Sequence, residues 1–256
     1  MDPGSPAERD RRVLAFAAEH RFIVAAQIAA LLGATVRVGA KQIEDLSSGG
    51  RMRAVTGVSG EVAGHQITRA GLAALGSPLP APRPPDLSAY HHDLGLGWLM
   101  LLAERGRFGP VREVVSERRM RSDDGRRPDG ALSHGVRLGG VGPGGRPRLH
   151  HPDMLLVTQA GHRVAFELEL TGKATRRREG ILAAYAADRR IDLVVYLVAD
   201  VRTGRAIERS AARLGMSDLV RVGRVTVGAP GPRPGGGPVI ARRASRPPTA
   251  MAEAGR

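Results

Sequence analysis

The sequence predicts an α/β fold in two parts, a small helical module followed by a larger domain with a mixed sheet. Three observations support this prediction. The first part carries three segments with helical spacing before a short pair of strands, a proline-rich stretch follows, and apolar runs of strand and helix length then alternate. Helical stripes recur every three or four residues and strand patterns every two, so the two kinds of element are separable. We therefore expect a helical module at residues 9–76, a linker at 77–90, an α/β domain at 91–227 and a disordered basic tail at 228–256.

The composition limits the class of protein. With 256 residues the chain has room for two modest domains. The absence of cysteine excludes disulfides and thiolate metal sites. The longest apolar runs are too short to span a bilayer, and no basic segment followed by an apolar one opens the chain. These features predict a soluble, cytoplasmic protein without a membrane partner.

The net charge of +14 favours a nucleic-acid partner. Lys41 and Lys173 are the only lysines among 39 basic residues, and this arginine bias is typical of a GC-rich genome, whatever the function. The position of the charge is more informative. Residues 1–76 hold 9 basic and 7 acidic residues, residues 77–228 hold 25 and 17, and residues 229–256 hold 5 and 1. The excess therefore lies mainly in the second half of the chain.

The first module has the order of a winged helix-turn-helix domain. The expected elements are helices at 13–17, 25–32 and 35–48, strands at 51–56 and 64–68 joined by a turn at 57–60, and a closing helical turn at 69–75. Gly33 ends the second helix and Thr35 caps the third. The inward positions of the third helix are expected to be Val36, Ala40, Ile43 and Leu46.

This order indicates where the module would contact DNA. In DNA-binding members the third helix enters the major groove, so Arg37 and Lys41, one turn apart, are candidate DNA contacts. Arg51 and Arg53 are candidate phosphate contacts from the wing. The alternative is a winged helix that contacts protein, with an ordinary solvated face.

The second domain is expected to begin with a buried helix and to end with alternating strands and helices. The predicted elements are a helix at 91–104, a strand at 111–121 containing Glu113 and Glu117, a long mobile glycine-rich loop at 125–145, strands at 154–157 and 164–170, a helix at 175–187, a strand at 192–199, a helix at 203–214 and a strand at 220–227. This order of elements predicts an α/β sandwich.

Three acids gather around one predicted hairpin. Side chains alternate along a strand, so Glu167 and Glu169 point to the same face, and the hairpin can bring Asp153 near them. Such an oxygen-rich pocket suits a divalent metal. The alternative is an exposed face of an edge strand, with Arg176 to Arg178 as counter-charges. The adjacent histidines at 91–92 and 150–151 point apart, so a zinc site is not expected.

The three arginines at 176–178 form a separate signal. They occupy the first turn of a predicted helix, where the helix dipole disfavours cations. Such a position calls for an anion. The sequence leaves open whether that anion is the pair of glutamates or a nucleic-acid phosphate.

The order of elements, with Pro-Asp before one strand and Glu-x-Glu on the next, resembles the PD-(D/E)xK, or restriction-endonuclease-like, fold. With the winged helix in front, the chain resembles the actinobacterial replication-relaxation family, which is linked to plasmids and mobile elements. The likeness covers about residues 9–225. The segments that carry it are Arg12-Val13-Leu14-Ala15-Phe16, His20-Arg21-Phe22-Ile23, Ile67-Thr68-Arg69-Ala70-Gly71-Leu72, His92-Asp93-Leu94, Ser116-Glu117-Arg118, Pro152-Asp153, Glu167-Leu168-Glu169-Leu170 and residues 189–198.

The resemblance implies roles for particular residues. Asp153 and Glu167 would hold Mg²⁺, and Glu117 or Asp93 would supply a further acid. Glu169 stands where the fold has its lysine, and Lys173 would act as a migrated lysine. The candidate catalytic residues that the resemblance implies are therefore Asp153, Glu167, Glu169 and Lys173.

The resemblance also implies a partner and two alternative activities. The partner would be double-stranded DNA of a plasmid or mobile element, and a homodimer stays open. The protein would act either as a DNA-binding factor with Mg²⁺-dependent nicking or as a non-catalytic regulator or adaptor with a degenerate nuclease fold.

Overall fold

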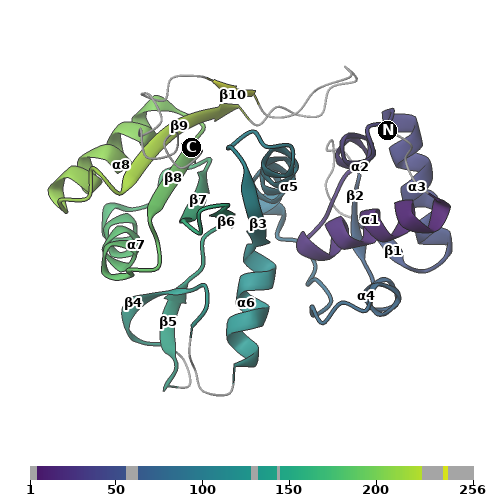
Figure 1. Ribbon diagram of the computed structural model, residues 1–256, viewed down its shortest axis with the longest axis horizontal. Helices are drawn as coiled ribbons and strands as arrows, with labels where there is room; N and C mark the ends of the chain where they lie inside the picture. Colours follow the sequence, from purple (N-terminus) through teal and green to yellow (C-terminus); the bar gives the residue numbers. More distant parts are fainter. Residues whose placement is uncertain (1–4, 56–62, 128–131, 143–144, 227–238, 242–256) are drawn as a thin grey trace. The chain divides into compact units, whose positions relative to one another are not determined.

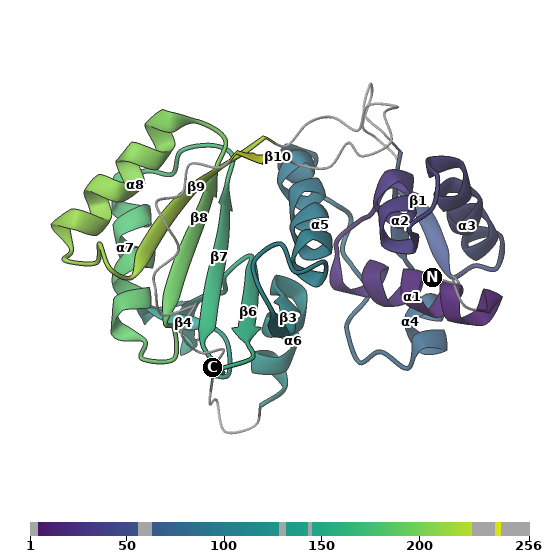
Figure 2. The same cartoon turned by 45° about the horizontal axis from the view of Figure 1, so that its top comes forward.

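The computed structural model describes residues 5–55, 63–127, 132–142, 145–226 and 239–241, and the chain is a mixture of helices with parallel and antiparallel strands (Figures 1 and 2). The mixed α/β class predicted from the sequence is therefore confirmed. Contacts between residues divide the chain into two compact units, one up to Arg105 and the other from Gly106.

Unit 1 consists of helices around a two-stranded antiparallel sheet. Its elements are α1 (Pro6–Glu19), α2 (Ala25–Leu32), α3 (Val36–Ser48), β1 (Met52–Val55), β2 (Gly64–Ile67), α4 (Arg69–Leu75), η1 (Leu87–Ala89) and α5 (Tyr90–Glu104). The predicted capping residues act as expected. Thr35 accepts a hydrogen bond from the Val38 amide, and Gly33 ends α2 with a φ of 65°, which favours glycine.

The two predicted strands pair with each other in antiparallel orientation. Ala54 lies opposite His65, and the predicted turn at 57–60 falls outside the described residues. Ile23, between α1 and α2, extends the pair through a bridge to His65, with both backbone hydrogen bonds at 2.8 Å. The segment before α2 is thereby fixed against the sheet.

Helix α3 crosses α2 at very short range. A Cβ added to Gly39 would overlap the carbonyl oxygen of Ala25, so the position accepts only glycine without movement of the backbone. This crossing turns α3 relative to the prediction. Ile43 and Leu46 are buried as expected, but Val36 is 48% exposed and Ala40 is also exposed, because Gly39 takes the inward place.

Helix α5 was predicted correctly as an element, but its contacts are those of unit 1. The Gln27 side chain, fully buried, donates to the Leu94 carbonyl oxygen at 2.9 Å, and Phe22 stacks on Tyr90. The proline-rich stretch also packs on this unit, since the Gln66 amide donates to the Arg83 carbonyl oxygen. The predicted linker therefore does not mark the division of contacts, which falls after α5.

Unit 2 is built on one mixed sheet. Its elements are β3 (Val111–Ser116), α6 (Glu117–Arg126), β4 (Val136–Val141), β5 (Pro147–His150), β6 (Met154–Thr158), β7 (Arg163–Glu169), α7 (Thr175–Ala187), β8 (Leu193–Val198), α8 (Val201–Arg213), β9 (Val220–Thr226) and β10 (Val239–Ala241). The strand order is β10-β9-β8-β7-β6-β3, with β7, β8 and β9 parallel and the other neighbours antiparallel. Helices α7 and α8 pack beside each other on the parallel strands (Figure 1).

Three predictions for unit 2 were wrong. Glu117 does not extend the strand, because Ser116 caps a helix there through its hydroxyl. The described part of 125–145 is not simply a loop, since β4 pairs with β5 as a hairpin. Residues 239–241 of the predicted disordered tail form a strand on β9, and the rest of that tail lies outside the described residues.

Among the residues that the structure describes, no helix combines the length and apolar character needed to cross a membrane.

Candidate functional site

The two glutamates of β7 lie in the interior of unit 2. Glu167 is 1% exposed and Glu169 6%, and β7 is an inner strand between β6 and β8. The alternative of an exposed edge strand with arginine counter-charges is therefore wrong. Buried carboxylates require hydrogen bonds or opposite charges nearby, so the partners of these groups decide what the site can do.

Glu167 is held by one histidine and one tyrosine. The Nε2 atom of His150, on β5, lies 2.6 Å from Glu167 Oε1, and the Tyr185 hydroxyl on α7 donates to the same oxygen. Burial by itself would raise the pKa of Glu167, but the charges of His150 and Lys173 and these hydrogen bonds keep it below its ordinary value.

The contact with the Glu167 carboxylate also shifts the pKa values of its partners, His150 and Tyr185. Burial opposes the protonation of His150, but the carboxylate outweighs burial and raises the pKa of His150. Burial and the carboxylate together raise the pKa of Tyr185 well above its usual range. His150 and Glu167 thus form a buried ion pair, with the tyrosine as a neutral donor.

Asp153, Glu169 and Lys173 lie around Glu167, and we call these four residues the carboxylate centre. The amide of Leu168, between the two glutamates, donates to Asp153 Oδ2 at 2.8 Å, and Lys173 forms an ion pair with Glu169. Burial raises the pKa of Glu169, with the charges of Glu167 and Asp153 adding to the effect and Lys173 opposing it. The structure therefore brings together the four residues predicted as catalytic.

Each carboxylate of the centre has one oxygen engaged with a partner within the described residues. One Glu167 oxygen accepts both the histidine and the tyrosine, and Glu169 is neutralised by Lys173. Within the described ranges, no group of three or more His, Asp or Glu side chains is placed to hold a metal ion. As arranged, the donor set fits an internally compensated charge cluster better than a magnesium site.

The two further acids are engaged elsewhere. Glu117, on α6, forms an ion pair with Arg121 at 2.7 Å. Asp93, on α5 in unit 1, lies 3.9 Å from the Arg21 guanidinium. Neither is among the largest causes of the pKa shifts of Glu167 and Glu169.

His150 and Tyr185 were missed by the sequence interpretation. The two adjacent histidines do point apart, as predicted, because His150 meets Glu167 while His151 Nε2 lies 3.1 Å from Asp124. A signal for Tyr185 was present, since it follows Ile181 at helical spacing on an apolar face that must be buried. A tyrosine on such a face needs an acceptor for its hydroxyl.

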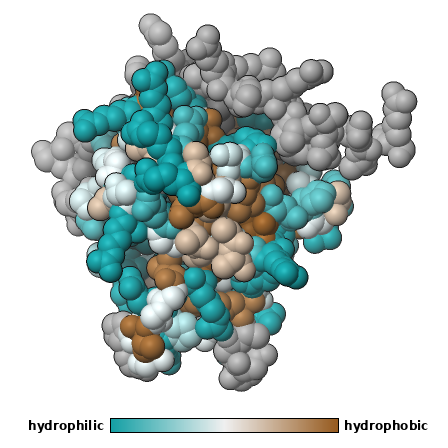
Figure 3. All heavy atoms as spheres, turned by 90° about the vertical axis from the view of Figure 1, so that its left-hand side faces the viewer, coloured by the Kyte–Doolittle hydropathy of each residue, from teal (hydrophilic) through white to brown (hydrophobic). Residues whose placement is uncertain are grey.

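The arginine cluster of α7 is not paired with the buried glutamates. Arg178 donates to the Ser210 hydroxyl, the Lys173 carbonyl oxygen and the Thr175 hydroxyl. Arg176 and Arg177 are exposed, as is a row of arginines on α8 at positions 202, 205 and 209. In the view of Figure 3, hydrophilic residues surround a central hydrophobic area. These cations at the surface of unit 2 are accessible to anionic partners.

Helix α3 of unit 1 carries the predicted DNA contacts. Arg37 is exposed, whereas Lys41 Nζ lies 2.5 Å from Asp45 and 3.9 Å from Glu44. The hydrogen bond and charge of Asp45 raise the pKa of Lys41. Lys41 is thus a partly compensated cation.

The two arginines of the strand pair make contacts within unit 1. Arg51 forms an ion pair with Asp10 at 3.2 Å, and Arg53 donates to the Gln66 side chain at 3.0 Å. A phosphate would have to compete with these contacts.

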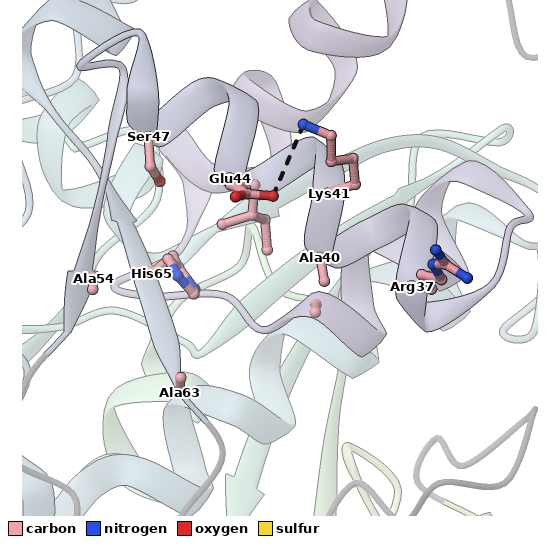
Figure 4. Close-up of a pocket in the computed structure, with 10 residues that line it drawn as sticks. Arg37, Ala40, Lys41, Glu44, Ser47, Ala54, Ala63 and His65 are labelled. Carbon is pink, nitrogen blue, oxygen red and sulfur yellow. Dashed lines mark ion pairs between the residues drawn. The ribbon is translucent and has the colours of Figure 1, made fainter.

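A hollow of about 930 Å³ lies between α3 and the strand pair (Figure 4). The lining residues are Ala25, Arg37, Ala40, Lys41, Ile43, Glu44, Ser47, Ala54, Ala63 and His65. Figure 4 shows Ser47, Glu44, Ala40 and Arg37 in sequence along the helix, with His65 on the facing strand.

Comparisons of the chain with protein-family models, with curated proteins and with solved structures found no match in any of the three. The functional interpretation therefore depends on the residues and their geometry.

Proposed function

We propose that the protein binds double-stranded DNA, with unit 1 as a winged helix-turn-helix domain whose helix α3 enters the major groove. The observation that carries the proposal is the exposure of the first half of α3, directly after a tight turn from α2. Val36, Arg37, Val38 and Lys41 are all exposed, although Val36 and Val38 are apolar. In helix-turn-helix domains these N-terminal positions contact base edges, and apolar groups there meet thymine methyl groups.

The close crossing of α2 and α3 supports this assignment, since it presents one face of α3 away from the core. The isolated bridge between Ile23 and His65 supports it as well, because it joins the segment before α2 to the strand pair. The exposed arginines of α7 and α8 supply further charge for phosphate contacts, which do not depend on sequence.

We further propose that unit 2 is a PD-(D/E)xK-like domain of the replication-relaxation type in which the carboxylate centre stabilises the fold rather than cleaving DNA. Three observations support a structural role: His150 and Tyr185 both engage one oxygen of Glu167, Lys173 neutralises Glu169, and Asp153 accepts a backbone amide. On this proposal the protein is a DNA-binding regulator or adaptor of plasmid or mobile-element maintenance.

Mg²⁺-dependent nicking is the second candidate function. It is favoured by the convergence of Asp153, Glu167 and Lys173, the residue types found in active nucleases of the resembling fold. It requires that the metal bind the second oxygen of Glu167 or displace His150 and Tyr185, the donors that now occupy the first.

DNA binding is tested by fluorescence anisotropy with a labelled duplex at several salt concentrations. We expect affinity to fall linearly with the logarithm of salt concentration. Arg37→Gln is expected to lower the slope by about 1. Arg69→Gln, an equal charge loss on α4, serves as the matched control. A slope near zero for the wild type contradicts the proposal.

The role of unit 2 is tested with supercoiled plasmid in Mg²⁺ or Mn²⁺. We expect no nicking by wild type, Asp153→Asn or Glu167→Gln, while all three retain DNA binding. The Gln variant keeps an acceptor for the Tyr185 hydroxyl, so it limits loss of folding. Nicking by wild type that both variants lack would establish the second candidate instead.

A further inference from the structure

The hollow beside α3 is an open depression that is large enough to hold a small molecule. Its volume of about 930 Å³ falls within the range of about 300–1,000 Å³ that is common for ligand pockets. It stays open because small residues face each other across it. Ala40 lies on the helix, Ala54 and Ala63 lie on the strand side, and Ile43 is buried beneath them.

One end of the hollow carries an uncompensated cation. Lys41 and Glu44 also line it, and Lys41 lies 2.5 Å from Asp45 and 3.9 Å from Glu44, so its charge is compensated on the helix itself. Arg37 makes no hydrogen bond or ion pair with any other residue that the structure describes, and its guanidinium is exposed. This end therefore attracts an anion, and a planar guanidinium matches a carboxylate in two parallel hydrogen bonds.

The other end carries polar atoms that need partners. Ser47 Oγ and His65 Nδ1 are shielded from solvent and make no hydrogen bond within the described residues. Such atoms are uncommon in folded proteins. Burial lowers the pKa of His65, so its imidazole is neutral at pH 7 and offers one donor and one acceptor. A polar group on a ligand would find partners here after a small rotation of either side chain.

The spacing of the two ends sets the length of the ligand. Ten residues of α-helix separate Arg37 from Ser47, a rise of about 15 Å. A ligand that lies along this length therefore needs an elongated apolar body, such as two fused rings.

We propose that this hollow binds a small amphipathic organic acid, with its carboxylate on Arg37, its apolar body on the alanines and Ile43, and a distal polar group toward Ser47 and His65. The site does not depend on DNA binding, although it shares Arg37 with the proposed DNA interface.

The test is isothermal titration calorimetry of the full chain, without DNA, using three matched probes: 2-naphthoate, its neutral amide 2-naphthamide, and 6-hydroxy-2-naphthoate. We expect 2-naphthoate to bind about tenfold more tightly than the amide, because only the acid pairs with Arg37. The distal hydroxyl is expected to strengthen binding further.

Variants assign the binding to this hollow. Arg37→Gln should remove the difference between acid and amide, whereas Arg69→Gln should preserve it. Ala40→Phe and Ala54→Leu fill the hollow from opposite walls, and each should weaken 2-naphthoate at least tenfold. Ala212→Phe, on an exposed position of α8, should have no effect. Circular dichroism identifies any variant that fails to fold.

Equal binding of acid and amide by wild type, or undiminished binding by both filled variants, would overturn the proposal. Loss of DNA binding would not, since no DNA is present in this assay. The failure of the ligand site and the failure of the DNA-binding function are therefore distinguishable.

Discussion

Helix α3 in unit 1 and strand β7 in unit 2 both carry several charged side chains. Those on α3 are exposed to solvent, whereas the glutamates on β7 are buried. On α3, Arg37 is exposed and the ion pair of Lys41 with Asp45 is in solvent. On β7, Glu167 and Glu169 are buried and each has a specific partner. An exposed charge is hydrated and costs little, while a buried charge is stable only with its partner present.

The difference indicates which region is free to bind. The charges on β7 are used within unit 2, so they contribute to a fixed internal structure. Those on α3 face solvent beside a hollow, so a ligand or a DNA phosphate can reach them. On the proposed DNA-binding function, contacts with a partner are therefore expected at α3 and not at the acids of β7.

The largest effect on stability is expected from breaking the buried ion pair of His150 and Glu167. Glu167→Ala leaves His150 without its counter-charge and the Tyr185 hydroxyl without its acceptor, which should lower the free energy of unfolding by about 3–5 kcal/mol. Glu44→Ala on α3, where the side chain is exposed, should change it by less than about 0.5 kcal/mol. Urea denaturation measures both. Similar losses in the two variants would contradict the contrast between the regions.

A smaller loss of stability is expected at the contact that positions α3 against α2. Gly39→Ala places a methyl group against the Ala25 carbonyl oxygen and should cost about 1–3 kcal/mol. The control is Gly125→Ala in α6, where a Cβ meets nothing within 4 Å. That change should stabilise the protein by up to about 1 kcal/mol. Thermal denaturation measures both variants. A stabilising effect of Gly39→Ala would contradict the close crossing of α2 and α3.

The buried pair should also make stability depend on pH. The pKa of His150 is raised in the folded state, so its contribution is fully present below the unfolded value of about 6.5 and is lost as pH rises through the folded value. The pKa of Glu167 is lowered, so its contribution disappears only as pH falls below about 4.5.

Urea midpoints measured between pH 5.5 and 9 check this dependence. Wild type should lose stability across the alkaline part of the range, and His150→Gln should be less stable at pH 6 with a flatter profile. Exposed His162 provides the control, because His162→Gln should retain the wild-type profile. Parallel profiles for wild type and His150→Gln would show that the pair does not form.

The smallest effect on stability, and an informative one on binding, is expected at the surface of α3. Asp45→Asn removes the counter-charge of Lys41 while both side chains remain exposed. We expect unchanged thermal unfolding, tighter DNA binding and a steeper salt dependence. Asp218→Asn, an equal charge change in unit 2, is the comparison for a general effect of net charge. If Asp45→Asn weakened binding, Lys41 would not face the DNA.

Local sequence predicted most elements of the fold. The helices at 25–32 and 175–187 were predicted to the residue, because Gly33 and the apolar spacing of each helix are local signals. The strand extending through Glu117 was not, since the Ser116 hydroxyl competes with the strand by capping a helix. The β4–β5 hairpin was missed because its glycines are also typical of loops.

The candidate site was predicted in part. The alternation along β7 placed Glu167 and Glu169 on a common face, and Asp153 was expected beside them. The partners of Glu167 come from β5 and α7, and no spacing along the chain relates them to it. For the same reason the inward face of α3 was misplaced, because the approach of Gly39 to α2 sets the rotation of the helix.

The sequence by itself determined the order of elements, the caps, the alternation of β7 and the positive charge, since these depend on neighbouring residues and on composition. Only the tertiary structure decided that β7 is an inner strand, that His150 and Tyr185 compensate Glu167, and that a hollow opens beside α3. Burial and pairing depend on residues distant in sequence, and they determine whether a charged side chain is available to a partner or used to stabilise the fold.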